Sequence, residues 1–167
     1  HGLASSPEAW GNVANELLAD EELRCAFQVW QVYYPTNMPL PANHAAIRQV
    51  LLAALHHFDP EDKTAASHGL VLVGHSMGGV LARLLVSTSD QQLLKWAESD
   101  PRIDLNRLGK SRAKIDPLLQ FQPFRGVERV IFIATPHRGT VVAGQGFGRW
   151  VAGLVRLPLT LLEALAG

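Results

Sequence analysis

The apolar positions of the chain recur with two different periods, which separates predicted helices from predicted strands. Helical spacing over residues 7–19 and 44–58 gives each segment one apolar face, and Asn43 is the predicted N-cap of the second helix. A further helix-forming run covers residues 80–86. Helices with a single apolar face need a sheet or one another to bury that face, so the pattern predicts a packed domain.

Three segments have the composition of β-strands. Residues 27–34 are rich in aromatic and β-branched types and end at Pro35. Residues 70–73 are all apolar, which is typical of a strand buried on both faces, and residues 129–134 form the third predicted strand. Strands that alternate with helices predict an α/β fold: a mainly parallel sheet with helices on both faces, and a functional edge at the carboxyl ends of the strands.

Composition adds bounds on the function. The 167 residues are 47% hydrophobic, enough for one domain with a core. The 15 Lys and Arg residues balance 15 Asp and Glu residues, so there is no electrostatic case for binding nucleic acid. Cys25 is the only cysteine, which excludes an internal disulfide and a cysteine zinc site but does not identify the cellular compartment. No metal or organic cofactor is implied, and no apolar run has the length of a membrane span.

A glycine-flanked serine joins the second predicted strand to the helix that follows it. The segment reads Gly74-His75-Ser76-Met77-Gly78, a G-x-S-x-G pattern. A sharp turn here exposes the serine hydroxyl in a strained backbone conformation, and the glycines avoid collisions with the neighbouring strand or helix. The helix N-terminus points its amides toward the serine, so the Met77 N–H is placed to stabilise an oxyanion. The alternative is a tight strand–helix turn whose serine has no chemical role.

This pattern resembles the nucleophile elbow of the α/β-hydrolase superfamily, in the form found in lipases and esterases. The resemblance implies that Ser76 is a nucleophile. The opening triplet His1-Gly2-Leu3 is similar to the end of an earlier strand in these lipases, which implies that the Leu3 backbone N–H is the second oxyanion donor.

A second family segment follows the strand at residues 129–134. Thr135-Pro136-His137-Arg138-Gly139 resembles the Thr-Pro-His-x-Gly segment that related lipases and deacylases carry next to the nucleophile strand. His137 is the only histidine after Ser76, but the family's base follows a later strand. We therefore expect His137 to line the acyl pocket or brace its loop rather than to act as the base.

The acid of a catalytic triad is equally hard to assign. None of the acidic residues between Ser76 and His137 directly follows a predicted strand. These residues are Asp90, Glu98, Asp100, Asp104, Asp116 and Glu128. The resemblance therefore implies a partial hydrolase domain, cut from a larger protein that supplies the acid and base. Such a segment is expected to be inactive or poorly folded alone.

The chain is interpreted as one α/β-hydrolase core segment, residues 1–167, with two irregular regions. Residues 87–126 form a long excursion with a small basic cluster, which predicts either transient contact with a lipid surface or a solvated loop face. Residues 141–167 lie where the family inserts its cap. Their apolar positions indicate either a lid over acyl chains or a helix of the core.

The predicted function is that of a serine hydrolase that cleaves carboxylic esters of lipid or acyl type through an acyl-enzyme on Ser76. The same elbow serves acyltransferases and thioesterases, and a non-catalytic binding relative would keep the fold without the chemistry. These alternatives remain open. The implied partners are a small-molecule or lipid ester and the remainder of the parent chain.

Overall fold

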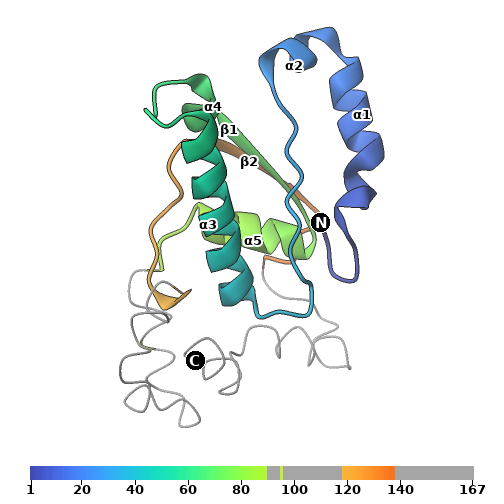
Figure 1. Ribbon diagram of the computed structural model, residues 1–167. Coiled ribbons are helices and arrows are strands. Elements are labelled where there is room, and N and C mark those ends of the chain that lie inside the picture. Colours follow the sequence, from blue (N-terminus) through green and yellow to red (C-terminus); the bar gives the residue numbers. More distant parts are fainter. Residues whose placement is uncertain (90–94, 96–117, 138–167) are drawn as a thin grey trace.

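The computed structural model describes residues 1–89, 95 and 118–137. In chain order, the elements are the 3₁₀-helix η1 (Pro7–Trp10), α1 (Gly11–Ala19), α2 (Glu21–Ala26), α3 (Leu40–Phe58), α4 (Ala65–His68), β1 (Leu70–His75), α5 (Met77–Leu85) and β2 (Val127–Ile133). Helices and parallel strands together make a mixed α/β structure, as predicted (Figure 1). None of the helices in the described ranges combines the length and apolar character needed to cross a membrane.

The sheet of the described residues has two parallel strands. Leu70 pairs with Val127 and His75 pairs with Ile133, with one irregularity in register just after Leu70. Both strands therefore end at the same edge, and Ser76 immediately follows the last paired residue of β1. The predicted strands at 70–73 and 129–134 are confirmed, with bounds shifted by one to two residues.

The prediction of a strand at residues 27–34 is wrong for the structure. This segment has no strand pairing and runs as an extended connection between α2 and α3 (Figure 1). Aromatic and β-branched residues suit a pleated surface, but a strand also needs a neighbouring backbone to pair with. Among the described residues, no strand forms hydrogen-bonded pairs with this segment. Its composition alone therefore does not make it a strand.

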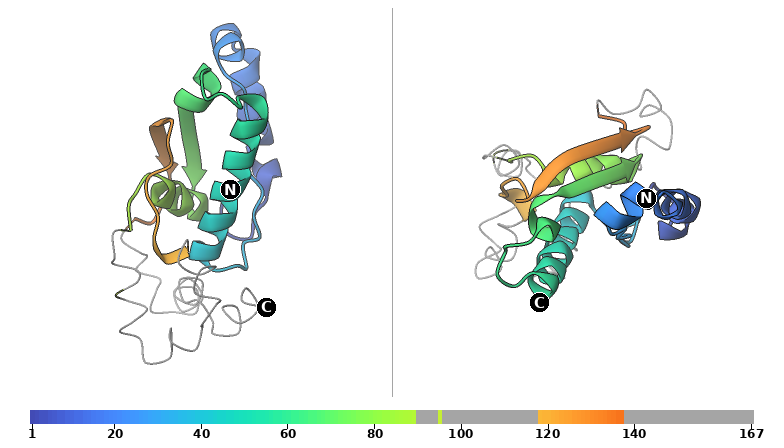
Figure 2. Two further views of the ribbon diagram at one scale, coloured as in Figure 1. Left: turned by 60° about the vertical axis from the view of Figure 1, so that its left-hand side comes forward. Right: turned by 90° about the horizontal axis from the view of Figure 1, so that it is seen from above.

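The two faces of the sheet differ in burial. Helix α5 packs along both strands, and α3 packs against α5 (Figure 2). On the opposite face, Val71 and Val73 remain 39% and 42% exposed, so β1 is not buried on both faces as predicted. Among the described helices, α5 is the one that packs extensively on the strands, so helices on both faces stay a prediction.

The hydrophobic core lies between α3, α5 and the segment that leads into β2. Its buried members share aliphatic or aromatic side chains: Tyr34, Leu40, Ile47, Leu55, Met77, Leu81, Leu85 and Phe124. The Phe124 N–H donates to the Leu85 carbonyl, which fixes the end of the 87–126 excursion against α5. The basic cluster of that excursion and the proposed cap at 141–167 lie outside the described residues.

Helix α1 is confirmed in position, but its apolar face is not buried. Of the residues that predicted this face, Ala14 is buried, whereas Val13, Leu17 and Leu18 are exposed.

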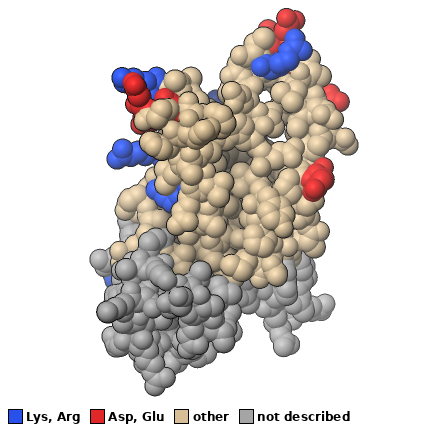
Figure 3. Space-filling view, in the orientation of Figure 1, with Lys and Arg blue, Asp and Glu red and all other residues tan. Residues whose placement is uncertain are grey.

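Charged side chains are sparse on the face drawn in Figure 3 and lie toward its upper end and margins.

Helix α3 begins earlier than predicted. Its N-cap is Pro39, with Pro41 in the first turn, a position that suits proline because its missing N–H would have no partner there. Asn43 therefore does not cap the helix. Its side-chain amide is buried and donates to the Pro35 carbonyl at 2.8 Å, which ties the preceding loop to the helix.

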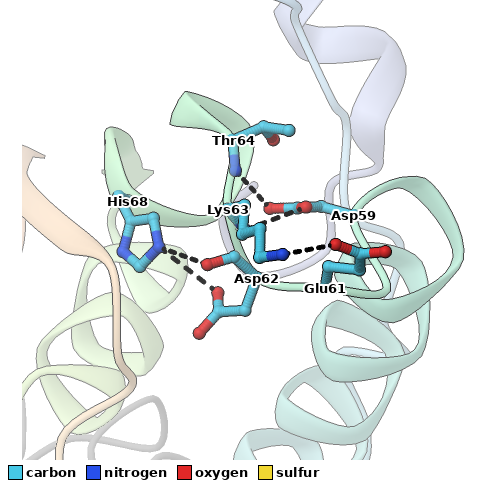
Figure 4. Close-up of polar contacts among 6 residues, drawn as sticks. All are labelled: Asp59, Glu61, Asp62, Lys63, Thr64 and His68. Carbon is cyan, nitrogen blue, oxygen red and sulfur yellow. Dashed lines mark hydrogen bonds and ion pairs between the residues drawn. The ribbon is translucent and has the colours of Figure 1, made fainter.

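A buried carboxylate closes the other end of α3. Asp59 accepts a hydrogen bond from the Ser67 hydroxyl at 2.7 Å. It also accepts from the Thr64 N–H at 2.9 Å and the Lys63 N–H at 3.1 Å (Figure 4). These donors favour the charged form, with Ser67 contributing most, and hold the pKa of Asp59 well below its ordinary value. The carboxylate thereby fixes the turn between α3 and α4.

We expect Asp59→Asn to lower the melting temperature by several degrees at neutral pH. A carboxyl whose folded pKa is depressed stabilises the fold above its unfolded pKa, and this contribution is lost as the pH falls through the folded pKa. The difference between wild type and variant should therefore narrow once the pH is lowered below the ordinary carboxyl pKa of 3.8. Thermal melts across this pH range test the prediction. Glu61→Gln is the control, because its exposed ion pair with Lys63 should contribute little.

Candidate active site

Ser76 occupies a one-residue junction between β1 and α5. Its backbone has φ 52° and ψ −119°, a left-handed conformation that a residue with a Cβ adopts only under strain. Its N–H donates to the Ile133 carbonyl at 2.9 Å, while its own carbonyl accepts from Gly79 at 3.1 Å. Both ends of the residue are therefore fixed, one by the sheet and the other by the helix.

These bonds involve only the backbone of Ser76 and not its side chain. It does not cap α5, and no hydrogen bond joins its hydroxyl to another described residue. The side chain is half-buried, neither sealed in the core nor fully in solvent. A hydroxyl in this setting can meet an incoming carbonyl carbon.

Close backbone contacts explain the glycines around the turn. A Cβ on Gly74 would lie 2.6 Å from the Gly79 Cα and 2.7 Å from the Gly78 carbonyl oxygen, which is closer than real Cβ atoms approach. A Cβ on Gly79 would overlap the Thr135 side chain, which follows β2. The strand, the helix and the loop after β2 can meet this closely because these positions lack side chains.

The first three residues lie against this turn. Gly2 is buried beside Ser76, since a Cβ on Gly2 would be 3.3 Å from the Ser76 Cβ and 3.1 Å from the His75 Nδ1. The Leu3 side chain packs against the core cluster that contains Met77. In Figure 1 the N-terminus likewise lies near the end of the strands, beside the start of α5.

The two predicted oxyanion donors are therefore brought to the same end of the sheet. Within the described ranges, neither the Leu3 N–H nor the Met77 N–H donates to another backbone or side-chain group. Met77 is the first residue of α5, where the helix leaves its amide without an internal acceptor. The positive end of the helix dipole adds to this donor's attraction for negative charge.

His137 stands apart from the serine in its bonding. Its ring is exposed and meets the Phe132 ring edge-on, with centroids 4.5 Å apart. The backbone N–H of His137 donates to the Thr135 carbonyl. No hydrogen bond or ion pair connects it with Ser76 or with a carboxylate among the described residues. A base for Ser76 is not identified in the described ranges, and a role of His137 in its loop or in an acyl pocket stays a prediction.

Of the candidate acids, the structure describes Glu128 alone. Asp90, Glu98, Asp100, Asp104 and Asp116 lie outside the described residues. Glu128 is the second residue of β2, five residues before the edge that Ser76 shares with Ile133. At about 3.3 Å per residue that is ~16 Å away, too far for contact. A metal site is also not evident, because the described part of the chain holds no group of three potential ligands.

Sequence reasoning missed Tyr34 as a residue near this site. Its hydroxyl donates to the His1 carbonyl, and the His1 and Tyr34 rings stack with centroids 4.1 Å apart. The sequence places these residues far apart, and assigning 27–34 to a strand gave no indication of this partner. The only local signal in the sequence was that Tyr34 directly precedes Pro35.

Comparisons with known proteins were made at three levels. No protein-family model, curated protein or solved structure matches this chain.

Proposed function

We propose that this chain carries the nucleophile of a serine hydrolase of the α/β-hydrolase superfamily that cleaves carboxylic esters of lipid or acyl type. The observation that supports the proposal most is the strained conformation of Ser76 at φ 52°, in a one-residue turn between a parallel strand and a helix. Backbone strain of this kind costs about 1–3 kcal/mol and is found mainly where a site uses it.

The chemistry follows from the groups around that turn. The Ser76 oxygen attacks the ester carbonyl carbon, its proton passes to a base, and the carbonyl oxygen becomes an oxyanion. The free N–H groups of Leu3 and Met77 donate to this oxyanion. The alcohol then leaves with a proton, and water releases the acid from the acyl-enzyme. An apolar acyl chain suits the surroundings, which include the exposed ring of Phe132 near the same edge.

The proposal assigns no general base or acid among the described residues. The contacts of His137 are with Phe132 and Thr135, which precede it on β2 and the following loop, and not with Ser76. We infer that the base and its acid are supplied by other parts of the complete protein, which makes activity a property of that protein.

Covalent labelling tests the nucleophile directly. We expect a fluorophosphonate probe to attach to the complete protein at one site, and peptide mass spectrometry should locate the adduct on Ser76. Prior heat denaturation should abolish labelling, because the unfolded chain lacks the activated hydroxyl. Absence of labelling in the folded protein, or an adduct on another serine, would contradict the proposal.

A further inference from the structure

We propose that Tyr34 is a positioning residue for the oxyanion hole: its hydroxyl holds the His1 carbonyl and thereby aims the Leu3 N–H at the reacting carbonyl. This inference rests on the function proposed above. It concerns how one donor is oriented, and Tyr34 itself does not touch the substrate.

The first reason is the freedom of the intervening residue. Leu3 follows Gly2, and glycine has the widest range of backbone conformations, so the direction of the Leu3 N–H is loosely defined by the chain itself. A rigid peptide plane joins the His1 carbonyl to the Gly2 nitrogen. Fixing that carbonyl therefore fixes one side of Gly2, while the packing of the Leu3 side chain on the core fixes the other.

The second reason is that residues 1–3, although packed against the turn, have few hydrogen bonds to the rest of the structure. Residues 1–3 form no strand pairing in the structure. Among the described residues, the Tyr34 bond is the one hydrogen bond that links them to a residue distant in sequence, since the His1 ring bonds only to the adjacent Gly2 carbonyl. The stacked ring of Tyr34 adds a second contact to His1.

The third reason is that the tether lies next to the other donor. A Cβ on Gly78 would be 2.6 Å from the His1 carbonyl oxygen and 3.2 Å from the Tyr34 hydroxyl. Gly78 directly follows Met77, so the bond between Tyr34 and His1 sits against the first turn of α5. The tether of the Leu3 segment and the Met77 N–H therefore both lie at the start of α5.

Tyr34 is itself firmly held. It is only 5% exposed, and burial raises its pKa to about 12, so the hydroxyl keeps its proton and remains a donor. The next carbonyl along the chain, that of Pro35, accepts from the buried Asn43 amide at 2.8 Å. A connected path therefore runs from α3 through Asn43 and Tyr34 to His1 and Leu3.

The test compares two adjacent tyrosines in the complete protein. Tyr34→Phe removes the hydroxyl and keeps the stacked ring, and we expect kcat for p-nitrophenyl butyrate to fall about tenfold, less than the loss of a whole donor. KM should stay within about twofold, because the donor acts on the transition state. Tyr33→Phe is the matched control, because Tyr33 is 73% exposed and its hydroxyl has no partner among the described residues.

A second readout separates positioning from general damage. Butylboronic acid forms a tetrahedral adduct with an active serine, and its Kd should rise in Tyr34→Phe by about the same factor as kcat falls. Tyr33→Phe should leave kcat and Kd unchanged. A wild-type kcat in Tyr34→Phe, an equal loss in Tyr33→Phe, or a change in KM alone would overturn the positioning role.

Two further outcomes are distinguished in advance. If the wild-type protein neither turns over the ester nor labels at Ser76, the proposed function fails, whereas labelled and active wild type with an indifferent Tyr34→Phe rejects this inference alone. If Tyr34→Phe does not fold, Asn43→Ala decides, since it loosens the same path and leaves the hydroxyl in place. A lower kcat at constant KM then supports the inference, and an unchanged kcat rejects it.

Discussion

Replacing Ser76 by alanine is expected to lower kcat/KM for ester hydrolysis in the complete protein by at least about a thousandfold. The variant keeps both proposed oxyanion donors but has no oxygen to form the acyl-enzyme. Its free energy of unfolding should change by less than about 0.5 kcal/mol, because the half-buried hydroxyl has no hydrogen-bond partner among the described residues. Steady-state kinetics and chemical denaturation measure the two effects separately.

Two other variants sharpen this result. Ser87→Ala is the control, since its hydroxyl donates to the Arg83 carbonyl at the far end of α5 and should not affect turnover. Ser76→Gly should be as inactive as Ser76→Ala but at least as stable, because glycine relieves the positive φ. If Ser76→Ala keeps more than a tenth of the activity, the nucleophile lies elsewhere.

The parts of the fold that sequence predicted best are those where local signals agree with the tertiary environment. The run before Ser76 is apolar, the turn is glycine-rich and the residues after it favour helix, and β1 and α5 follow in that order. Residues 27–34 show the opposite case. Their composition favours a strand, but pairing depends on a partner backbone that local sequence does not reveal.

At Asn43, the local sequence signals for a helix start predicted the wrong position. Its type favours a helix N-cap, and the apolar spacing after it predicted a helix start there. The helix instead begins at Leu40, and the buried amide of Asn43 is used for the loop at Pro35. The choice depends on a contact eight residues back, which helix periodicity does not encode.

The candidate site divides in the same way. The glycine pattern predicts the turn at Ser76 and the first amide of α5, because both follow from adjacent residues. Leu3 was reached only through a family resemblance, and its closeness to the turn depends on the packing of Gly2 against Ser76. Tyr34 was missed because its partner, the His1 carbonyl, lies 33 residues away in sequence.

The geometry of this turn makes Gly74 the position where a small change should affect stability most. We expect Gly74→Ala to lower the free energy of unfolding by about 3 kcal/mol or more, at the upper end of overpacking effects. The added methyl would lie 2.6 Å from the Gly79 Cα and 2.7 Å from the Gly79 nitrogen. These are backbone atoms, so no side-chain rotation relieves the contact, and β1 and α5 must move apart.

Gly11→Ala is the matched control for this prediction. Gly11 begins α1, and a Cβ there meets nothing within 4 Å, so alanine should stabilise the helix by up to about 1 kcal/mol. Urea denaturation of the two variants should therefore give shifts of opposite sign. Equal stability of Gly74→Ala and wild type would mean that β1 and α5 do not approach this closely. In that case the strain at Ser76 and the alignment of the Met77 amide, which both depend on the approach, would lose their structural basis.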